Sequence, residues 1–239
     1  MSFTARVELA AAFLLHSRPY RETSQLLEVL SQDYGRIGLV AKGSRRPKSR
    51  WKSALRPFQL CQMSWSGRGD LCTLRAVEPC GPPARVTGMP LMAAYYMNEL
   101  LIALMQRGDP HPNLFTHYGG ALASLASHVN TELVLRRFEL ALLAEIGYGI
   151  VVEHDVVDEQ PLDAERKYEY VLGRGPVPVA DAHTGELVFQ GSELLAIARG
   201  DQLGVQQLKS AKRLLRAVLN SILGDRPLKT RRVVAAMQR

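Results

Sequence analysis

The chain has 239 residues, of which 46% are hydrophobic, and carries a formal net charge of +7. This apolar content supports a folded core and argues against global disorder, and the absence of any run of 18 apolar residues excludes a membrane-spanning helix. The first residues lack the basic start and small-residue cleavage site of a secretory signal, so we expect a cytoplasmic protein.

The positive charge is concentrated at the two ends of the chain. Residues 1–80 have a net charge of +7, residues 81–206 a net charge of −8, and residues 207–239 a net charge of +8. Residues 34–69 contain nine lysines and arginines and no acidic residue. Such a one-sided segment is suited to a polyanion, because lysine and arginine neutralise phosphates and release condensed counterions.

The first 80 residues have the pattern of strands separated by turns. Apolar or alternating runs occupy residues 7–16, 25–31, 36–41, 58–65 and 71–77. Residues 66–70, Ser-Gly-Arg-Gly-Asp, predict a hairpin turn between the last two runs. Five short strands in this length favour a small closed barrel, for which the oligonucleotide-binding (OB) fold is the obvious candidate.

A Pro/Gly-rich segment at residues 78–83 then marks a change to helical periodicity. We predict helices over residues 91–107, 114–129, 132–146 and 208–222. Between the last two lies an acidic segment, residues 150–190, which we interpret as an irregular insertion with a little β structure. The sequence therefore predicts an α+β protein, with an OB-fold nucleic-acid-binding domain at residues 1–80 and a mainly helical domain at residues 81–239.

The motifs of common enzymes are absent from the sequence. It contains no GxxxxGK[ST] phosphate loop, no GxSxG nucleophile elbow and no HExxH zinc motif. Asp155 and Asp158 leave open a metal-dependent nuclease, although no third ligand or general base lies near them. The pattern favours a binding protein over an enzyme, with no catalytic residue.

We predict neither a cofactor nor a metal. The three cysteines, Cys61, Cys72 and Cys80, have no CxxC spacing, and the six histidines are scattered singly. A sparse, odd number of cysteines fits a reducing compartment.

The basic run, residues 34–69, and an upstream loop around Tyr20 supply the candidate nucleic-acid-binding residues. Trp51, inside the run, and Tyr20, between Arg18 and Arg21, are the aromatic candidates for stacking on bases, and the flanking charges of Trp51 argue against a core position. The full candidate set is Arg18, Tyr20, Arg21, Arg36, Lys42, Arg45, Arg46, Lys48, Arg50, Trp51, Lys52 and Arg56.

Several blocks along the chain resemble the RecO family of bacterial recombination mediators. These blocks include AFLLHSRPYRETS at residues 12–24, AKGSRR at residues 41–46, YMNEL at residues 96–100, LRRFE at residues 135–139 and LGDRPLKTR at residues 223–231. They cover nearly the whole chain in the family's order, and it is their combination that is specific.

The resemblance implies an OB barrel followed by a helical domain. It further implies a nucleoid-associated protein that binds single- and double-stranded DNA and anneals complementary strands without ATP. The family also binds the single-stranded-DNA-binding protein SSB and acts with RecR, and often RecF, to load RecA. Some family members carry a four-cysteine zinc site in the segment matching residues 150–190. This chain has no cysteine there, so we expect the segment to be metal-free.

A site for the acidic tail of SSB is a further hypothesis, on Arg136, Arg137, Lys212 and Arg213 beside apolar helix faces. The alternative for the first two is pairing with Glu139 or Glu132 within the domain. For the whole chain, the alternative function is an RNA-binding OB-fold protein of the translation apparatus, because composition does not separate DNA from RNA.

Overall fold

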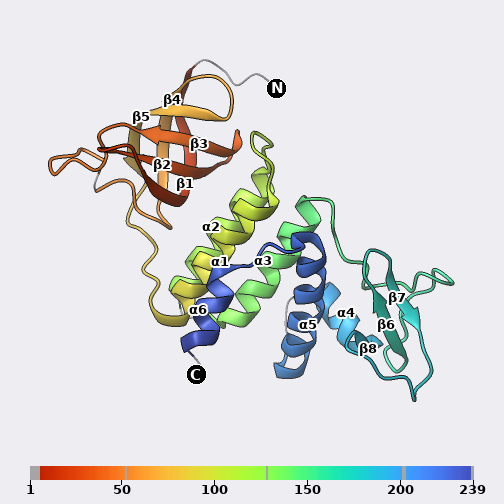
Figure 1. The fold of residues 1–239 in the computed structure, drawn as a ribbon. Helices are drawn as coiled ribbons and strands as arrows, with labels where there is room; N and C mark the ends of the chain where they lie inside the picture. The colour runs from red at the N-terminus through yellow and green to blue at the C-terminus, as the bar shows by residue number, and fades with distance from the viewer. Residues whose placement is uncertain (1–5, 52, 128, 201–202, 238–239) are drawn as a thin grey trace. The chain divides into compact units, whose positions relative to one another are not determined.

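The structure, a computed structural model, describes residues 6–51, 53–127, 129–200 and 203–237. By its contacts the chain forms two compact units (Figure 1). The first comprises Met1–Val129 with Leu228–Arg239, and the second comprises Asn130–Pro227. No helix among the described residues is both long enough and apolar enough to cross a membrane.

Five strands at the N-terminus form a closed barrel in the order β1-β2-β3-β5-β4, as expected for an OB fold. β3 and β5 are parallel, and the other neighbouring strands are antiparallel. β1 closes the barrel because one part of it pairs with β2 and another part pairs with β4. The strands are β1 (Arg6–Tyr20), β2 (Ser24–Ser31), β3 (Gly35–Ala41), β4 (Leu60–Ser66) and β5 (Leu71–Pro79).

The alternating sequence pattern explains the barrel core. In β4, Cys61, Met63 and Trp65 are buried, while the residues between them are partly exposed. Tyr34 packs edge-on against Trp65, with the ring centroids 5.3 Å apart. Burying a large apolar side chain contributes about 1.5–3 kcal/mol to folding, so the inward-facing set fixes the register of each strand.

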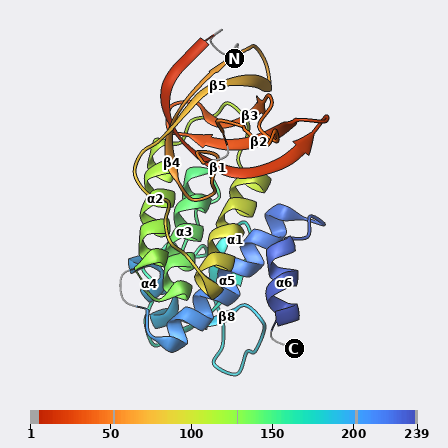
Figure 2. The same ribbon diagram turned by 90° about the vertical axis from the view of Figure 1, so that its left-hand side faces the viewer.

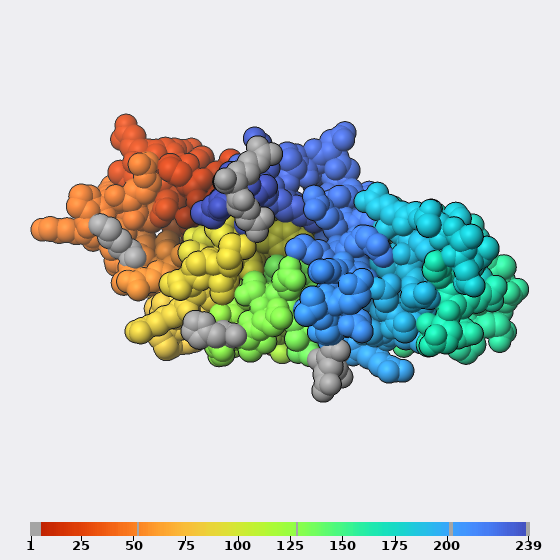
Figure 3. Space-filling view, turned by 90° about the horizontal axis from the view of Figure 1, so that it is seen from below, coloured from red at the N-terminus to blue at the C-terminus, as the bar shows by residue number. Residues whose placement is uncertain are grey.

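Two helices, α1 (Gly88–Leu104) and α2 (Pro112–Ala126), pack together in the same unit as the barrel (Figure 2). Phe13 of β1 contacts both Phe115 and Tyr118 of α2, with each pair of ring centroids 5.1 Å apart. The last helix, α6 (Lys229–Met237), lies against α1 and is dark blue in Figure 3. The strand-to-helix change falls between Pro79 and Gly88, although by contacts these helices group with the barrel.

The second unit contains three helices and a small sheet. α5 (Val205–Leu223) packs against α3 (Thr131–Glu145) and α4 (Gly191–Arg199). The acidic segment is more regular than expected, because β6 (Lys167–Val171), β7 (Gly175–Pro178) and β8 (Val188–Gln190) form a three-stranded sheet in the order β7-β6-β8.

Candidate nucleic-acid interface

An open pocket of about 530 Å³ lies on the barrel, where the β1–β2 turn approaches the segment that follows β3. Residues from five parts of the chain surround it: the end of β1, the β1–β2 turn, β2, β3 and the loop after β3. Its lining residues are Tyr20, Arg21, Thr23, Ser24, Val40, Lys42, Gly43 and Arg46.

Local hydrogen bonding positions the pocket. Tyr20 pairs with Ser24 across the hairpin, and Arg21 in the turn adopts a positive φ of 51°. The loop after β3 is tied to this turn, because the Arg45 amide donates to the Thr23 carbonyl at 2.9 Å. The Arg45 guanidinium reaches the Glu22 carbonyl at 3.4 Å. These bonds hold the loop after β3, which belongs to the basic run, next to the β1–β2 turn.

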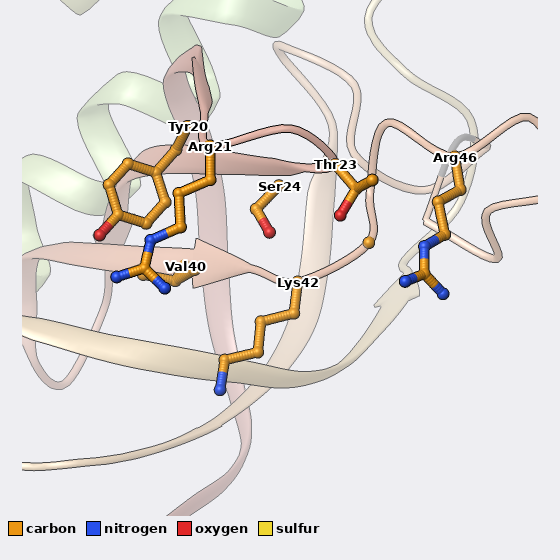
Figure 4. Close-up of a pocket in the computed structure, with 8 residues that line it drawn as sticks. Tyr20, Arg21, Thr23, Ser24, Val40, Lys42 and Arg46 are labelled. Carbon is orange, nitrogen blue, oxygen red and sulfur yellow. The ribbon is translucent and has the colours of Figure 1, made fainter.

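The charged residues that line the pocket are all cationic. Arg21, Lys42 and Arg46 are exposed, and their charged ends extend to the same side of the pocket (Figure 4). The Arg21 guanidinium carbon lies 5.2 Å from the centroid of the partly exposed Tyr20 ring. Proteins use cations and hydroxyls to bind phosphates and aromatic rings to stack on unpaired bases, and this pocket presents both kinds of group.

Most of the other candidate cations are also exposed on the barrel. The Arg50 guanidinium carbon lies 4.2 Å from the Trp51 ring centroid, and its Nη2 donates to the Arg75 carbonyl at 3.2 Å. Lys52 lies outside the described residues. The exposed candidates beyond the pocket are Arg18, Arg45, Lys48, Arg50 and Arg56.

The expectation that Trp51 lies outside the core is wrong. Its side chain is only 7% exposed and belongs to the barrel core, and its indole Nε1 donates to the Lys42 carbonyl at 3.1 Å. The ring therefore has no free face for a base. Trp51 instead anchors the basic loop to the barrel, while Arg50 covers the ring from outside.

Arg36 is also placed differently from the expectation. Its Nη1 pairs with the Glu28 carboxylate at 3.0 Å, and its Nε donates to the Met105 carbonyl at 3.1 Å. The structure therefore does not bring Arg36 into the pocket as a freely exposed phosphate ligand.

The four candidates for the SSB tail lie on α3 and α5 of the second unit, but they differ in accessibility. Arg136 is 6% exposed and pairs with the buried Glu139 at 2.9 Å, so the intradomain alternative is confirmed for this residue. Arg137, Lys212 and Arg213 are exposed.

Each of these three exposed cations also has a partner within the unit. Lys212 pairs with Glu132 at 2.8 Å, and this bond lowers the pKa of the Glu132 carboxyl. Arg137 donates to the Gly200 carbonyl at 3.0 Å, and the Arg213 guanidinium carbon lies 4.2 Å from the Phe189 ring centroid. All three cations therefore make contacts within the unit while their side chains stay exposed.

Asp155 has a local structural role. Its Oδ1 accepts hydrogen bonds from the amides of Asp158 at 2.7 Å and Val157 at 3.0 Å, and these bonds lower the pKa of its carboxyl. Throughout the described ranges, no group of three or more His, Cys, Asp or Glu side chains is arranged to hold a metal ion. The Asp155 carboxylate thus serves the turn formed by its own neighbours.

Comparisons with known proteins identify the family. Residues 6–83 match the family model described as "Recombination protein O N terminal", and residues 89–232 match "Recombination protein O C terminal". The chain belongs to the RecO family of DNA repair proteins.

Individual relatives agree over nearly their whole lengths. The DNA repair protein RecO of Nitrosococcus oceani is 44% identical over 98% of this chain and 95% of its own length. The RecO protein of Azoarcus sp. is 43% identical over 98% of both chains, and that of Photobacterium profundum is 43% identical over 93% of this chain and 94% of its own. Membership of the RecO family supports a role in DNA repair and recombination and the binding of DNA.

Sequence reasoning missed several pocket residues. Thr23, Ser24, Val40 and Gly43 carry no charge, so they were not among the candidates, although all but Val40 lie in the blocks that resemble the family. The signal that could have found them is the strand pairing. Because Ser24 pairs with Tyr20 and Gln25 pairs with Ala41, the β1–β2 turn and the loop after β3 must lie side by side.

Proposed function

We propose that this chain binds single- and double-stranded DNA through the barrel and anneals complementary strands without ATP. The observation that carries the proposal is the pocket lined by Arg21, Lys42 and Arg46, which has no acidic lining residue and has the Tyr20 ring beside it. Phosphates neutralise the three cations, and an unpaired base stacks on the ring. The sequence has no phosphate loop for ATP, which fits annealing driven by binding alone.

The proposal includes the partners of a recombination mediator: SSB, RecR and, in some settings, RecF, with RecA loading as the outcome. The names of the relatives, "DNA repair protein RecO", support this role at the level of the pathway. For the acidic tail of SSB, the exposed cations are Arg137, Lys212 and Arg213. Arg136 is left out because its guanidinium is buried against Glu139.

Annealing of two complementary oligonucleotides, each coated with SSB, tests the first part. We expect faster annealing without nucleotide, with the acceleration fading as salt rises. If about six phosphates are contacted, the logarithm of the single-strand binding constant falls with the logarithm of salt concentration at a slope of about −4. Absence of acceleration by folded protein, together with tighter binding of RNA than DNA in competition, would favour the translation-apparatus alternative.

Binding of a fluorescent SSB-tail peptide tests the second part. The variant Arg137→Glu with Lys212→Glu reverses two charges on α3 and α5, and we expect it to lose most of the peptide binding. A matched control is Arg18→Glu with Lys48→Glu on the barrel, which should keep it. Equal peptide affinity of the two double variants would contradict this location for the tail site.

A further inference from the structure

The pocket is one end of a longer surface on the barrel. In the antiparallel pair β2–β3, Leu26 is opposite Val40 and Glu28 is opposite Gly38. Side chains two residues apart in a strand share a face, and directly opposed residues point to the same side. The pocket residues Ser24 and Val40 therefore lie on the same face as Glu28 and Arg36, about 13 Å further along the strands.

A second pair of arginines meets at that far end. Arg107, three residues beyond α1, crosses the face at Gly38, where the lack of a side chain makes room for its guanidinium. Its Nη1 donates to the Asp70 carbonyl at 2.7 Å, and its Nη2 pairs with Oε1 of Glu28. Arg36 holds the other oxygen, Oε2, at 3.0 Å. Each oxygen of one carboxylate thus has its own guanidinium.

This arrangement of two arginines around one anion is similar to that of phosphate-binding sites in proteins. Two guanidinium groups present several fixed N–H donors to adjacent oxygens of one anion, and a phosphate has the same need as a carboxylate. The three side chains remain partly open to solvent, with exposed fractions of 30% for Arg107, 23% for Glu28 and 15% for Arg36. A strand leaving the pocket along this face reaches them.

We propose that Arg36 and Arg107 form a second phosphate subsite and that the Glu28 carboxylate occupies it, which limits the affinity of the barrel for single-stranded DNA. The inference rests on the proposed DNA-binding function. Glu28 acts as an internal competitor: a backbone phosphate must displace it to reach the two guanidinium groups. The net charge of the three side chains is +1. The carboxylate therefore cancels part of the electrostatic attraction between the two arginines and a DNA phosphate.

The test is the affinity of a fluorescent single-stranded oligonucleotide over a salt series. Glu28→Gln keeps the shape of the side chain and removes its charge. We expect several-fold tighter binding at low salt and a salt slope steeper by about 0.7, the value for one additional phosphate on a single strand. The double variant Glu28→Gln with Arg107→Gln should lose most of this gain.

A matched control separates the local effect from the change in net charge. Glu8 lies in β1 and pairs with Arg6 at 2.6 Å, so Glu8→Gln removes the same charge from the barrel beside an exposed arginine away from the Glu28 site. Identical affinity and slope for Glu28→Gln and Glu8→Gln would overturn the inference while leaving the DNA-binding proposal intact. Absence of salt-dependent binding by the unaltered protein would instead count against the DNA-binding proposal itself.

The unaltered protein offers a second measurement, independent of the folding of any variant. A dicarbonyl reagent modifies accessible arginines, and mass spectrometry reports the extent at each site. With single-stranded DNA bound, we expect Arg107 to be protected together with Arg21. Protection of Arg21 with unchanged modification of Arg107 would contradict the second subsite.

Discussion

Tyr118 donates a hydrogen bond from its hydroxyl to Oδ1 of Asn98 at 2.6 Å, and both side chains are buried. The Asn98 Nδ2 in turn donates to the Leu15 carbonyl of β1 at 2.8 Å. One asparagine of α1 therefore joins the barrel to α2. Burial of the Tyr118 ring raises the pKa of its hydroxyl, so this group remains a donor throughout the physiological pH range.

Replacing Asn98 with alanine should destabilise the first unit. The change leaves the Leu15 carbonyl and the Tyr118 hydroxyl buried without this partner, and an unsatisfied buried group costs about 1–3 kcal/mol. We expect a loss of about 2–3 kcal/mol in the free energy of unfolding, measured by urea denaturation. Asn113→Ala, at an exposed position of α2, is the control and should change the free energy by less than about 0.5 kcal/mol. Equal effects of the two variants would contradict the bridging role of Asn98.

Removing cations from the pocket should weaken DNA binding in a way that salt reveals. For Arg21→Ala, Lys42→Ala and Arg46→Ala, each loss should make the salt slope for a single strand shallower by about 0.7. Arg85→Ala removes an exposed arginine from the segment between barrel and α1 and should leave the slope unchanged. The idea that the pocket binds phosphates fails if Arg85→Ala and the pocket variants shift the slope equally.

Tyr20 should matter more for the binding of single strands than for the binding of duplexes. Stacking of a base on an aromatic ring contributes about 1–3 kcal/mol, and bases within a duplex are not available for it. We expect Tyr20→Leu to reduce affinity for single strands by roughly 5- to 150-fold and to affect duplex binding much less. Tyr20→Phe keeps the ring and should bind nearly as well as the unaltered protein, whereas a comparable loss in this variant would point to the hydroxyl instead.

The barrel could be predicted from sequence because alternation of buried and exposed residues is a local signal, visible in Cys61, Met63 and Trp65. The burial of Trp51 could not. Its neighbours are charged, and only the folded loop shows that the indole enters the barrel while Arg50 covers it.

Arg36 fails as a simple surface candidate for a related reason. Its partner Glu28 precedes it by eight residues, but Arg107 and the Met105 carbonyl come from beyond α1. The local composition places Arg36 in a basic run, because the Glu28 carboxylate that neutralises it lies outside that run. Long-range pairing, rather than local pattern, decides which cations are available to DNA.

The thiols should differ in reactivity according to burial. Cys61 and Cys72 are buried, whereas Cys80 is exposed. Burial, with a smaller contribution from Cys80, raises the pKa of the Cys61 thiol from 9.0 to about 11, and burial also raises the pKa of Cys72. At pH 8 a thiol reagent should therefore modify one cysteine in the folded protein and three in denaturant.

The same shift predicts the direction of a pH effect. Because the folded state holds the Cys61 proton more tightly, its contribution to stability is present below pH 9 and is lost as pH rises toward about 11. The free energy of unfolding of Cys61→Ala should fall less steeply over this window. Rapid modification of all three thiols at pH 8 in the folded protein would contradict the burial of Cys61 and Cys72.

One carboxylate caps the start of the last helix. The Glu99 oxygens of α1 accept hydrogen bonds from the amides of Lys229 at 2.7 Å and Thr230 at 3.0 Å, and from the Thr230 hydroxyl at 2.7 Å. Amides in the first turn of a helix have no carbonyl acceptor within the helix, and a negative charge is favourable at that position. None of the residues within α6 is itself buried, so little apolar packing holds the helix in place.

Glu99→Ala should therefore release α6 without unfolding the barrel. Loss of a helix cap costs about 1–2 kcal/mol, which corresponds to roughly 5- to 30-fold more frequent local opening. We expect trypsin to cleave after Arg231 and Arg232 faster by a similar factor, while the unfolding midpoint of the barrel changes little. Glu78→Ala, at the exposed end of β5, removes the same charge and should leave the cleavage rate unchanged. If both variants are cleaved at the rate of the unaltered protein, α6 is held by contacts other than those of Glu99.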